Sequence, residues 1–552
     1  MVRRNLPLRG RLTAILAFMP VIVMPPSTGV ANEPTSQPSS GRIQLSREHV
    51  DAVNRPRRIV MNYDALATIF QYKPPNGKAD IESLKQFMLG ILDLGGSQID
   101  SVGWCWSEGN EAPYPSKILP TLLDIRTFTQ FPDGTDAVRI CCDETRRRGI
   151  ESFFSLRING GDHDRKYIDG TVARVPLKQQ HPEWLINWNP DPDGPPQPIG
   201  PHHSVGLWNF VAKGVRDHKI AVLREIAENY DFDGIEVDFA RASPVLPLGR
   251  QWENRAHLTD FMRRLRITLL EVADKRGRPL LLSARVPETL VGCHFDGIDV
   301  ETWARDQLVD ILVLGVRSLD VDIAAFRRIT TGTPIKLYPC NDFIHHSDGN
   351  DPGDTAAYGL TKGRAVYANW WHQQPDGVYT FNYTYHGQNW SLYREIGSPE
   401  SLRFLDKTFA VQRRGGLRGG GIVPLDPNDW ATPRLAYATT NMLASLPTSL
   451  DSAAKADTLL QLHVADNVHE VADRLEYLKL SVRISRTIPI EVRVNNMLLT
   501  GATSRNDWWD FEPLPITLAA GPNLIGIRLS EALTKQDDPI KVENVELQVD
   551  YR

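Results

Sequence analysis

The sequence predicts an α/β protein in which a (β/α)8 TIM barrel is followed by a C-terminal antiparallel β-sandwich. Between about residues 57 and 382, short apolar segments alternate with longer amphipathic segments, eight times in all. The short segments are continuously apolar, as are the strands of a parallel sheet that is buried on both faces. After about residue 455 the apolar residues alternate with period two, which is typical of a sandwich.

Eight strand–helix units close a barrel. An open doubly wound sheet is the alternative, but no GxGxxG motif follows the first strand and no GxxxxGK[ST] motif occurs. The Gly-rich stretch 415–421 lacks the lysine of a phosphate loop and is interpreted as a turn. The predicted barrel strands are 58–63, 97–106, 150–158, 234–239, 279–286, 310–316, 335–338 and 377–382, and the predicted helices include 81–94, 135–148, 211–230, 257–276, 300–307, 323–329 and 358–372.

The C-terminal segment is predicted to be a separate accessory domain that supports the barrel or binds glycan through Trp508 and Trp509. Turn signals such as Asn495-Asn496 and Gly501 separate its strands. These strands are predicted at 459–464, 477–484, 488–494, 514–518, 524–529 and 540–549. The predicted domains are a signal peptide at 1–31, a linker at 32–55, the barrel at 56–450 and the sandwich at 455–552.

The first residues follow the order of a secretory signal peptide. Four arginines precede a short apolar run at 12–24, and Gly29-Val30-Ala31 is a small-residue cleavage site. We therefore expect an exported protein, periplasmic or extracellular. An uncleaved N-terminal anchor is the alternative. A membrane-spanning helix needs about 20 consecutive apolar residues, and no later segment has them. We therefore expect no membrane span after cleavage.

Composition and charge exclude several classes of protein. Hydrophobic residues make up 41% and charged residues 23%, which is ordinary for a globular protein, and a net charge of −5 gives no basic face for nucleic acid. The five cysteines have no CxxC spacing, so they are predicted to be mainly core thiols, with one disulfide left open. The sequence does not indicate an oligomeric state.

The predicted fourth strand carries the clearest candidates for chemistry, because barrel active sites form at the C-terminal ends of the strands. Side chains alternate along a strand, so Glu236 and Asp238 both point to the barrel mouth, about 6.5–7 Å apart along the backbone. Repulsion between them raises the pKa of one, which suits a general acid. The alternative is that both are structural acids bonded to arginines.

We predict that Asp238 takes one catalytic role and that Glu236, or Glu288 on the neighbouring strand, takes the other. Arginines at strand ends bind a substrate carboxylate or sulfate, or serve as counter-ions of the acids. Aromatic rings there are expected to stack on sugar rings. The substrate-binding candidates at predicted strand ends are Arg157, Asn159, Arg241, Arg285, Tyr338, Asn382, Tyr63, Asp64, Trp104 and Trp106.

Neither a cofactor nor a catalytic metal is expected. The HExxH and GxSxG motifs are absent. Asp162-His163-Asp164 and His345-His346 are local hints of a metal, but adjacent side chains point apart unless a loop turns them. The acidic loop 348–354 is a candidate calcium site but lacks EF-hand spacing.

Several short motifs also resemble a known family. The stretch DFDGIEVDFAR, with SLRIN, HPEW and DGVYTFNY, resembles bacterial glycosyl hydrolase family 10-like glycosidases over about residues 55–450. The resemblance implies an exported (β/α)8 glycosidase with carbohydrate as its substrate. DFDGIEVDFA is also similar to the DGxDxDxE strand of chitinase-type enzymes, with Asp233, Glu236 and Asp238 at its acidic positions. Ala240 stands where those enzymes have the catalytic acid, which argues against chitinase chemistry and substrate-assisted hydrolysis.

The sequence therefore predicts an exported glycoside hydrolase that acts on a poly- or oligosaccharide through paired carboxylates. A non-catalytic carbohydrate-binding barrel is one alternative, since Ala240 replaces an acid. The other is a polysaccharide lyase in which Tyr338 or Tyr383, with an arginine, abstracts a proton beside a uronate.

Overall fold

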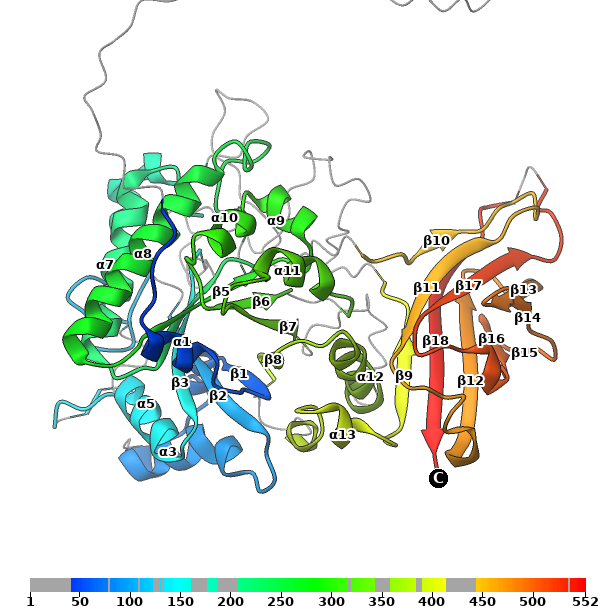
Figure 1. The fold of residues 1–552 in the computed structure, drawn as a ribbon, viewed down its shortest axis with the longest axis horizontal. Coiled ribbons are helices and arrows are strands. Elements are labelled where there is room, and N and C mark those ends of the chain that lie inside the picture. Colours follow the sequence, from blue (N-terminus) through cyan, green and yellow to red (C-terminus); the bar gives the residue numbers. More distant parts are fainter. Residues whose placement is uncertain are drawn as a thin grey trace, which may run out of the picture. The chain divides into compact units, whose positions relative to one another are not determined.

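The eight apolar segments of the sequence form eight parallel strands, which close into a barrel in the computed structural model (Figure 1). They pair in sequence order, and β8 returns to β1 with Ile59 beside Val378. The predicted fold class is therefore confirmed. The strands are β1 (Ile59–Tyr63), β2 (Ile99–Ser107), β3 (Glu151–Arg157), β4 (Gly234–Asp238), β5 (Leu281–Val286), β6 (Ile311–Leu314), β7 (Lys336–Asp342) and β8 (Val378–Phe381).

The structure describes most of the chain after Gly41. The predicted signal peptide and the Gly-rich stretch 415–421 lie outside the described residues. These are 41–77, 80–107, 110–122, 130–131, 133–159, 176–186, 207–241, 243–315, 319–342, 358–383, 390–413, 443–534 and 537–552.

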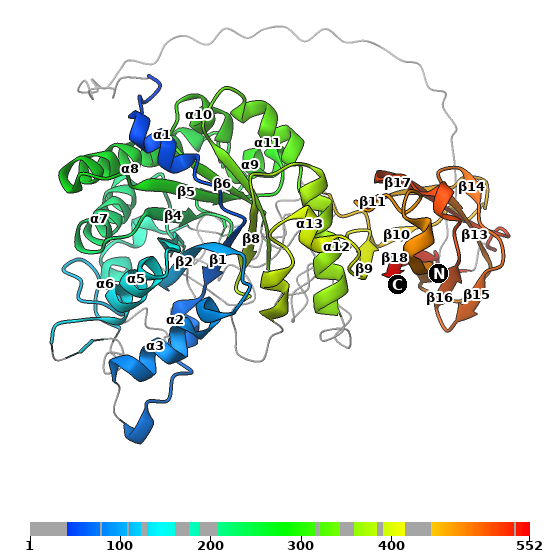
Figure 2. The ribbon, with the colours of Figure 1, turned by 60° about the horizontal axis from the view of Figure 1, so that its bottom comes forward.

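Helices surround the barrel strands (Figures 1 and 2). Several begin with an aspartate whose side chain accepts a hydrogen bond from the first turn, as Asp136 does at α5 and Asp322 at α11. Helix α8 ends at Gly277, whose φ of 69° is left-handed. The helices are α1 (Arg47–Val53), α2 (Ala65–Ile69), α3 (Ile81–Leu89), α5 (Ala137–Arg147), α6 (Pro176–Gln180), α7 (Lys213–Asn229), α8 (Arg255–Arg276), α9 (Leu290–Asp296), α10 (Val300–Arg305), α11 (Ile323–Thr330), α12 (Tyr358–His372) and α13 (Pro399–Leu402).

Buried side chains pack on both sides of the barrel wall. The larger core lies between strands and helices, and a smaller cluster fills the barrel interior. The interior cluster includes Val60, Phe153, Leu281 and Ile311, which stand at or near the N-terminal ends of their strands. The polar residues that point into the barrel therefore lie closer to the C-terminal ends of the strands.

The N-terminal end of the barrel is closed by α1, which differs from the linker predicted at 32–55. Val53 belongs to the interior cluster, and His49 Nε2 lies 3.0 Å from Asp310 Oδ1. Asp310 also accepts hydrogen bonds from Arg266, which is fully buried, and from the Leu282 amide at 2.7 Å. The sequence analysis missed this helix because most of its residues are polar. Only a few of its side chains face the barrel, so it shows no clear apolar period.

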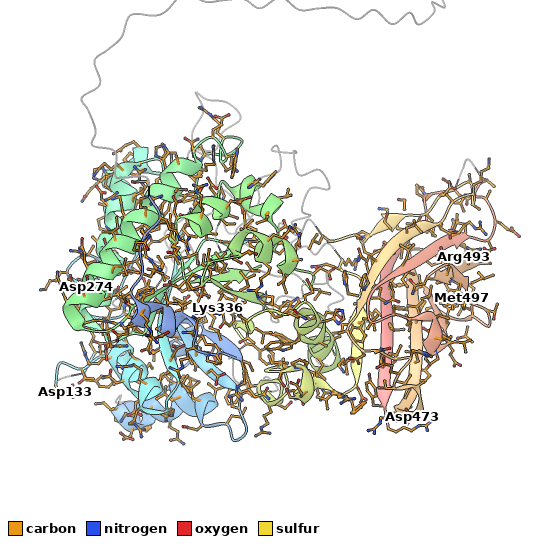
Figure 3. The ribbon with its side chains drawn as sticks, in the orientation of Figure 1. Asp133, Asp274, Lys336, Asp473, Arg493 and Met497 are labelled. Atoms are coloured by element: carbon orange, nitrogen blue, oxygen red, sulfur yellow. The ribbon has the colours of Figure 1, made fainter. Side chains whose placement is uncertain are left out.

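The C-terminal domain has two antiparallel sheets, as predicted, with strand orders β10-β18-β12-β16-β15 and β11-β17-β13-β14. Arg493 and Met497 mark β13 and β14 in Figure 3. The predicted strand 514–518 is wrong, since it is a 3₁₀ turn at Pro515–Thr517. The strands are β10 (Thr448–Ser449), β11 (Thr458–Val464), β12 (Leu475–Ile484), β13 (Ile490–Val494), β14 (Met497–Leu498), β15 (Thr503–Arg505), β16 (Trp508–Phe511), β17 (Gly521–Leu529) and β18 (Lys541–Tyr551).

The boundary between the two domains differs from the predicted one at 450–455. Strand β9 (Lys407–Ala410) pairs with β18, although it lies within the range assigned to the barrel. Figures 1 and 2 both show β9 beside α12. Across this junction Lys362 Nζ donates to Glu546 Oε1 at 2.7 Å, and the Asn369 side chain bonds the backbone of β11.

Two further predictions concern the whole chain. All five cysteines are buried, as expected for core thiols. In the part of the chain that the structure describes, no helix has the length and apolar character that crossing a membrane requires.

Candidate active site

Asp238 ends β4 at the C-terminal face of the barrel, and three donors hold its carboxylate. Its Oδ1 accepts hydrogen bonds from the backbone N–H groups of Ala240, at 3.0 Å, and Arg241, at 2.9 Å. Its Oδ2 accepts from Arg285 Nη1 at 2.8 Å, and both side chains are fully buried. A buried carboxylate is costly unless it is paired in this way. The arrangement therefore places a paired carboxyl group at the point where barrel enzymes carry out chemistry.

Arg285 is itself fixed by contacts from two other strand ends. Its Nε donates to the Gly315 carbonyl beyond β6 at 3.1 Å, and its guanidinium carbon lies 3.7 Å from the ring centre of Phe381 on β8. Gly315 has a φ of 103°, which a residue with a side chain rarely adopts. Arg285 thus acts as a counter-ion of Asp238, one of the two roles that the sequence left open.

A second ion pair joins the ends of β1, β3 and β8. Arg157 Nη2 donates to Asp64 Oδ2 at 2.7 Å and to Asn382 Oδ1 at 3.2 Å. The Arg157 guanidinium also lies 5.5 Å from the Phe381 ring centre. The predicted candidates Asp64, Arg157, Asn382 and Arg285 therefore come together at the barrel mouth.

Glu236 lies deeper than Asp238, inside the barrel. Its Oε1 accepts hydrogen bonds at 2.7 Å from both Ser155 Oγ and the Tyr379 hydroxyl, and its Oε2 accepts one from Ser283 Oγ at 3.3 Å. Burial raises the pKa of Glu236, with a smaller contribution from the charge of Asp238, although the hydroxyl donors oppose the shift. The sequence prediction of two inward acids with a raised pKa on one is consistent with this geometry. The enclosing hydroxyls leave Glu236 3% exposed.

Two more carboxyl groups follow β5 and β6, the next two strands of the barrel. Glu288, the predicted alternative, is fully buried two residues beyond β5, and its carbonyl accepts from the Asp322 amide. Asp320, which the sequence analysis did not select, follows β6. Its backbone amide donates to Gln412 Oε1 at 2.8 Å. The side chain of Asp320 is half-buried and has no hydrogen-bond or ionic partner in the described chain, and burial raises its pKa to about 7.

Asp320 was missed because the apolar run of the sixth strand ends well before it. Four residues separate Gly315, just beyond the strand end, from Asp320. The polar residues Tyr379 and Ser155 were missed for another reason. They lie within apolar strands, and only the register of the barrel brings them to Glu236. The alternation that placed Glu236 inside the barrel was the available signal for them.

Three predicted aromatic contacts to substrate are wrong. Tyr63, Trp104 and Trp106 belong to the core between strands and helices. The Trp104 ring centre lies 4.6 Å from that of Tyr63 with the rings tilted, and Trp104 Nε1 donates to Thr145 Oγ1 of α5. These residues alternate with Asn62 and Gly103, which point inward, so the pleat of β1 and β2 turns the aromatic rings away from the barrel mouth.

Tyr338 and Asn159 also differ from prediction. The Tyr338 hydroxyl hydrogen-bonds Arg57, whose Nε in turn pairs with Glu151 at the N-terminal end of the barrel. Asn159 uses both ends of its amide for backbone, donating to the Pro244 carbonyl at 2.7 Å and accepting from the Trp208 amide at 2.6 Å. Arg241, the remaining candidate, is buried beside Asp238 and contributes its backbone N–H.

Within the described ranges, no group of three or more His, Cys, Asp or Glu side chains is arranged to hold a metal ion. Asp162-His163-Asp164, His345-His346 and the acidic loop 348–354 lie outside those ranges. At the barrel mouth, Asp64 forms an ion pair with Arg157 and Asp238 forms one with Arg285.

No family model and no curated protein matches the chain, so the family resemblance stays a prediction. Among solved structures, glycoside hydrolases with TIM barrels are similar to it. A cycloisomaltooligosaccharide glucanotransferase from Paenibacillus sp. has a TM-score of 0.36 and 12% identity, and covers 89% of this chain, which spans 57% of that one. The maltogenic α-amylase AmyB of Thermotoga neapolitana has a TM-score of 0.35 and 12% identity, and the match covers 86% of this chain and 99% of that one. The catalytic domain of chitinase B from Arthrobacter TAD20 has a TM-score of 0.38 and 10% identity, and the match covers 64% of this chain and 96% of that one. At these scores, any inference about function rests on the site itself.

Proposed function

We propose that this protein is a glycoside hydrolase and that Asp238 is its ionised catalytic carboxylate, the nucleophile or general base. One observation carries the proposal. Asp238 stands at the C-terminal end of β4, bonded to Arg285 and to two backbone N–H groups that stabilise its negative charge. Glycosidases need one carboxylate that stays ionised and one carboxyl group that delivers a proton.

Asp320 is the better supported of the two proton donors at the neighbouring strand ends. A general acid works best when its pKa lies near the operating pH, and burial raises the pKa of Asp320 to about 7. Its side chain is half-buried, whereas Glu288, like Asp238, is almost fully buried. In this mechanism Asp320 protonates the leaving oxygen while Asp238 attacks the sugar or activates water.

Glu236 takes a positioning role in this proposal. Its hydrogen bonds from Ser155 and Tyr379 tie β3 and β8 to β4, one layer below Asp238. Its carboxylate oxygens are already engaged by the hydroxyl groups of Ser155, Tyr379 and Ser283. Its charge state sets the field under Asp238, because the two carboxyl groups repel each other when both are ionised.

The geometry supports the lyase alternative less well. Tyr338 hydrogen-bonds Arg57 at the opposite end of the barrel, and burial raises the pKa of Tyr383 to about 12, which opposes its use as a base at neutral pH. A non-catalytic carbohydrate-binding barrel remains a distinct outcome of the test below, since it needs the mouth but no proton donor.

Turnover by single variants tests the proposal. The full chain is assayed on a panel of neutral, uronic and sulfated polysaccharides, with reducing ends measured for hydrolysis and ultraviolet absorbance for unsaturated products. On the best substrate we expect Asp238→Asn and Asp320→Asn to lose at least about a thousandfold in kcat, as removal of a catalytic group does. Near-normal rates in Asp238→Asn exclude the proposal, and unsaturated products establish the lyase. Binding without any turnover establishes the non-catalytic alternative.

We also propose that the protein is exported, on the sequence features of residues 1–31 alone. Mass spectrometry of the protein from its native host is expected to find an N-terminus near Asn32. A mature protein that retains Met1 excludes cleavage.

A further inference from the structure

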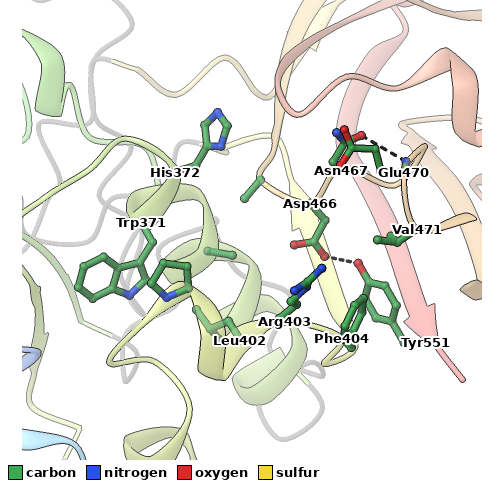
Figure 4. Close-up of a pocket in the computed structure, with 13 residues that line it drawn as sticks. Trp371, His372, Leu402, Arg403, Phe404, Asp466, Asn467, Glu470, Val471 and Tyr551 are labelled. Carbon is green, nitrogen blue, oxygen red and sulfur yellow. Dashed lines mark hydrogen bonds between the residues drawn. The ribbon is translucent and has the colours of Figure 1, made fainter. Parts of the chain in front are cut away.

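A cavity of about 260 Å³ lies where α12 and α13 meet the C-terminal domain, outside the barrel (Figure 4). Helix α12 leads into β8, so its last residue, His372, lies toward the N-terminal ends of the strands, away from the face that carries Asp238. A ligand in this cavity therefore leaves the barrel mouth open.

The floor of the cavity holds a carboxylate with one oxygen occupied and one available. Asp466 Oδ2 accepts a hydrogen bond from the Tyr551 hydroxyl at 2.6 Å (Figure 4). The same oxygen accepts one from Lys407 Nζ at 2.9 Å. Asp466 Oδ1 has no hydrogen-bond donor within the described residues. Lys407 is fully buried, so this network fixes Asp466 in place and leaves Oδ1 to accept from a ligand.

The cavity also holds donors that have no strong partner. The Arg403 guanidinium lies 4.7 Å from the ring centre of Phe404 and makes no ion pair in the part of the chain described. Asn467 and Glu470 line the other side, and Asn467 Oδ1 accepts from the Glu470 amide at a long 3.5 Å (Figure 4). A fixed acceptor, a planar cation and an amide match the adjacent hydroxyl groups of a sugar, each of which both donates and accepts.

An aromatic wall completes the arrangement. Trp371 is half-buried, and its Nε1 donates to the Ile396 carbonyl at 2.8 Å, which holds the ring in a single orientation. Pockets that bind small ligands combine an aromatic or apolar wall with a few placed polar groups. The volume is just under the about 300–1,000 Å³ of pockets that enclose a drug-sized ligand, so it suits one sugar ring rather than several.

The charges of the cavity favour a neutral ligand. Lys407 balances the charge of Asp466. Arg403 makes no ion pair among the described residues, and the exposed carboxylate of Glu470, which also lines the cavity, offsets its charge. We propose that this cavity is a secondary binding site for one ring of a neutral glycan chain, held by Trp371, Arg403 and Asp466. The ligand class rests on the proposed function, since the chain that binds here is expected to be the one that the barrel cleaves.

Calorimetric titration of the full-length protein tests the site. The probes are maltoheptaose, cellohexaose and chitohexaose, with hexagalacturonate as the anionic contrast, and an Asp238→Asn background prevents turnover. The test variant is Arg403→Ala, whose side chain is exposed. The matched control is Arg474→Ala, because Arg474 also lies over Phe404, at 4.6 Å, but does not line the cavity.

At least one neutral oligosaccharide is expected to bind with an affinity that falls about tenfold in Arg403→Ala, as loss of a charged hydrogen bond does, and not in Arg474→Ala. Equal losses in both variants, no loss in either, or tighter binding of hexagalacturonate overturns the proposal. Turnover separates it from the proposed function. If the protein cleaves no glycan but its binding depends on Arg403, the secondary site is supported and the proposed hydrolase activity is excluded. If it cleaves glycan but its binding does not depend on Arg403, the hydrolase activity is supported and the secondary site is excluded.

Discussion

Arg285 lies over the ring of Phe381, with its guanidinium carbon 3.7 Å from the ring centre, while the same guanidinium bonds Asp238. Arg157 approaches the same ring at 5.5 Å while it bonds Asp64. Because the face of an aromatic ring is electronegative, Phe381 attracts both cations. One apolar side chain thus orients both ion pairs of the barrel mouth.

Replacing Phe381 by leucine is therefore expected to lower kcat/KM about tenfold without removing a charged group. A cation–π contact is worth about 0.5–2 kcal/mol, and about 1.4 kcal/mol is tenfold in rate. Phe381→Tyr, which keeps the ring face, is the control. The measurement is kcat/KM together with the melting temperature, and equal values for Leu, Tyr and the parent protein would show that the ring orients neither arginine.

The sequence predicted the barrel because its signal is repeated and local. Each strand is a run of apolar residues, and each helix has its own period, so no long-range information was needed. The C-terminal half shows the limit of this reasoning. Strand β9 carries only four residues and pairs with β18, more than 130 positions later in the chain, so its local pattern could not assign it to a domain.

The candidate site was predictable only where chemistry and strand ends coincide. Asp238, Arg157 and Arg285 combine a charge with an inward position, and the alternation of side chains was enough to group them. Trp104 failed because residue type was given more weight than the pleat that turns it to α5. Phe381 was passed over because an apolar ring inside a strand looks like core until its two cation contacts are seen.

The buried ion network at the N-terminal end of the barrel is expected to matter for stability. Asp310 bonds Arg266 and His49, and these contacts hold the pKa of its carboxyl group well below the usual range, against the opposing effect of burial. Removing one member of a buried pair costs about 3–5 kcal/mol, because the partner charge stays buried. Asp310→Asn is therefore expected to lower the free energy of unfolding in urea by that amount at pH 7.

The sign of the pH dependence follows from the lowered pKa. The stabilisation by Asp310 is fully present above the unfolded pKa of about 4 and is lost as the pH falls through the lower folded value. The exposed pair Arg250–Glu253 supplies the control, and Glu253→Gln is expected to change the free energy of unfolding by less than about 1 kcal/mol. An equal change in both variants would mean that the buried network contributes no more than a surface pair.

Deleting residues 455–552 is expected to yield an aggregating protein rather than an isolated active barrel. The deletion removes β18, which pairs with β9, and exposes the buried side chains of Phe409, Val411 and Ala365 to solvent. An unpaired strand edge beside exposed apolar side chains favours aggregation. Soluble yield and light scattering measure this. A monomeric truncated protein with full activity would show that the barrel is independent of the C-terminal sheets.

Glu236→Gln is expected to lower kcat about tenfold, far less than Asp238→Asn. Glutamine fits the space and still accepts a hydrogen bond from Tyr379 or Ser155, but it removes the charge beneath Asp238. Kinetics of both variants on one substrate measure the difference, and kcat is expected to change more than KM because Glu236 lies away from the barrel mouth. A loss as large as that of Asp238→Asn would make Glu236 a catalytic group.

The strongest test of the proton donor uses pH and leaving group together. Burial raises the pKa of Asp320 to about 7, and a general acid acts in its protonated form, so kcat/KM is expected to fall as the pH rises through about 7. Asp320→Asn is expected to abolish this fall in kcat/KM at high pH, the basic limb of the pH profile. On a dinitrophenyl glycoside, whose leaving group needs no proton, the variant is expected to keep most of the rate. Glu288→Gln, the matched carboxyl control, is expected to keep the limb.

Stability supplies an independent readout for Asp320. Because its folded pKa is raised, the folded state binds the proton more tightly, and stability falls as the pH rises from about 4 to about 7. Asp320→Asn is therefore expected to melt at a higher temperature than the parent protein at pH 8 and at the same temperature at pH 4. A basic limb that moves with Glu288→Gln instead, with no pH-dependent gain in melting temperature for Asp320→Asn, would assign the proton to Glu288.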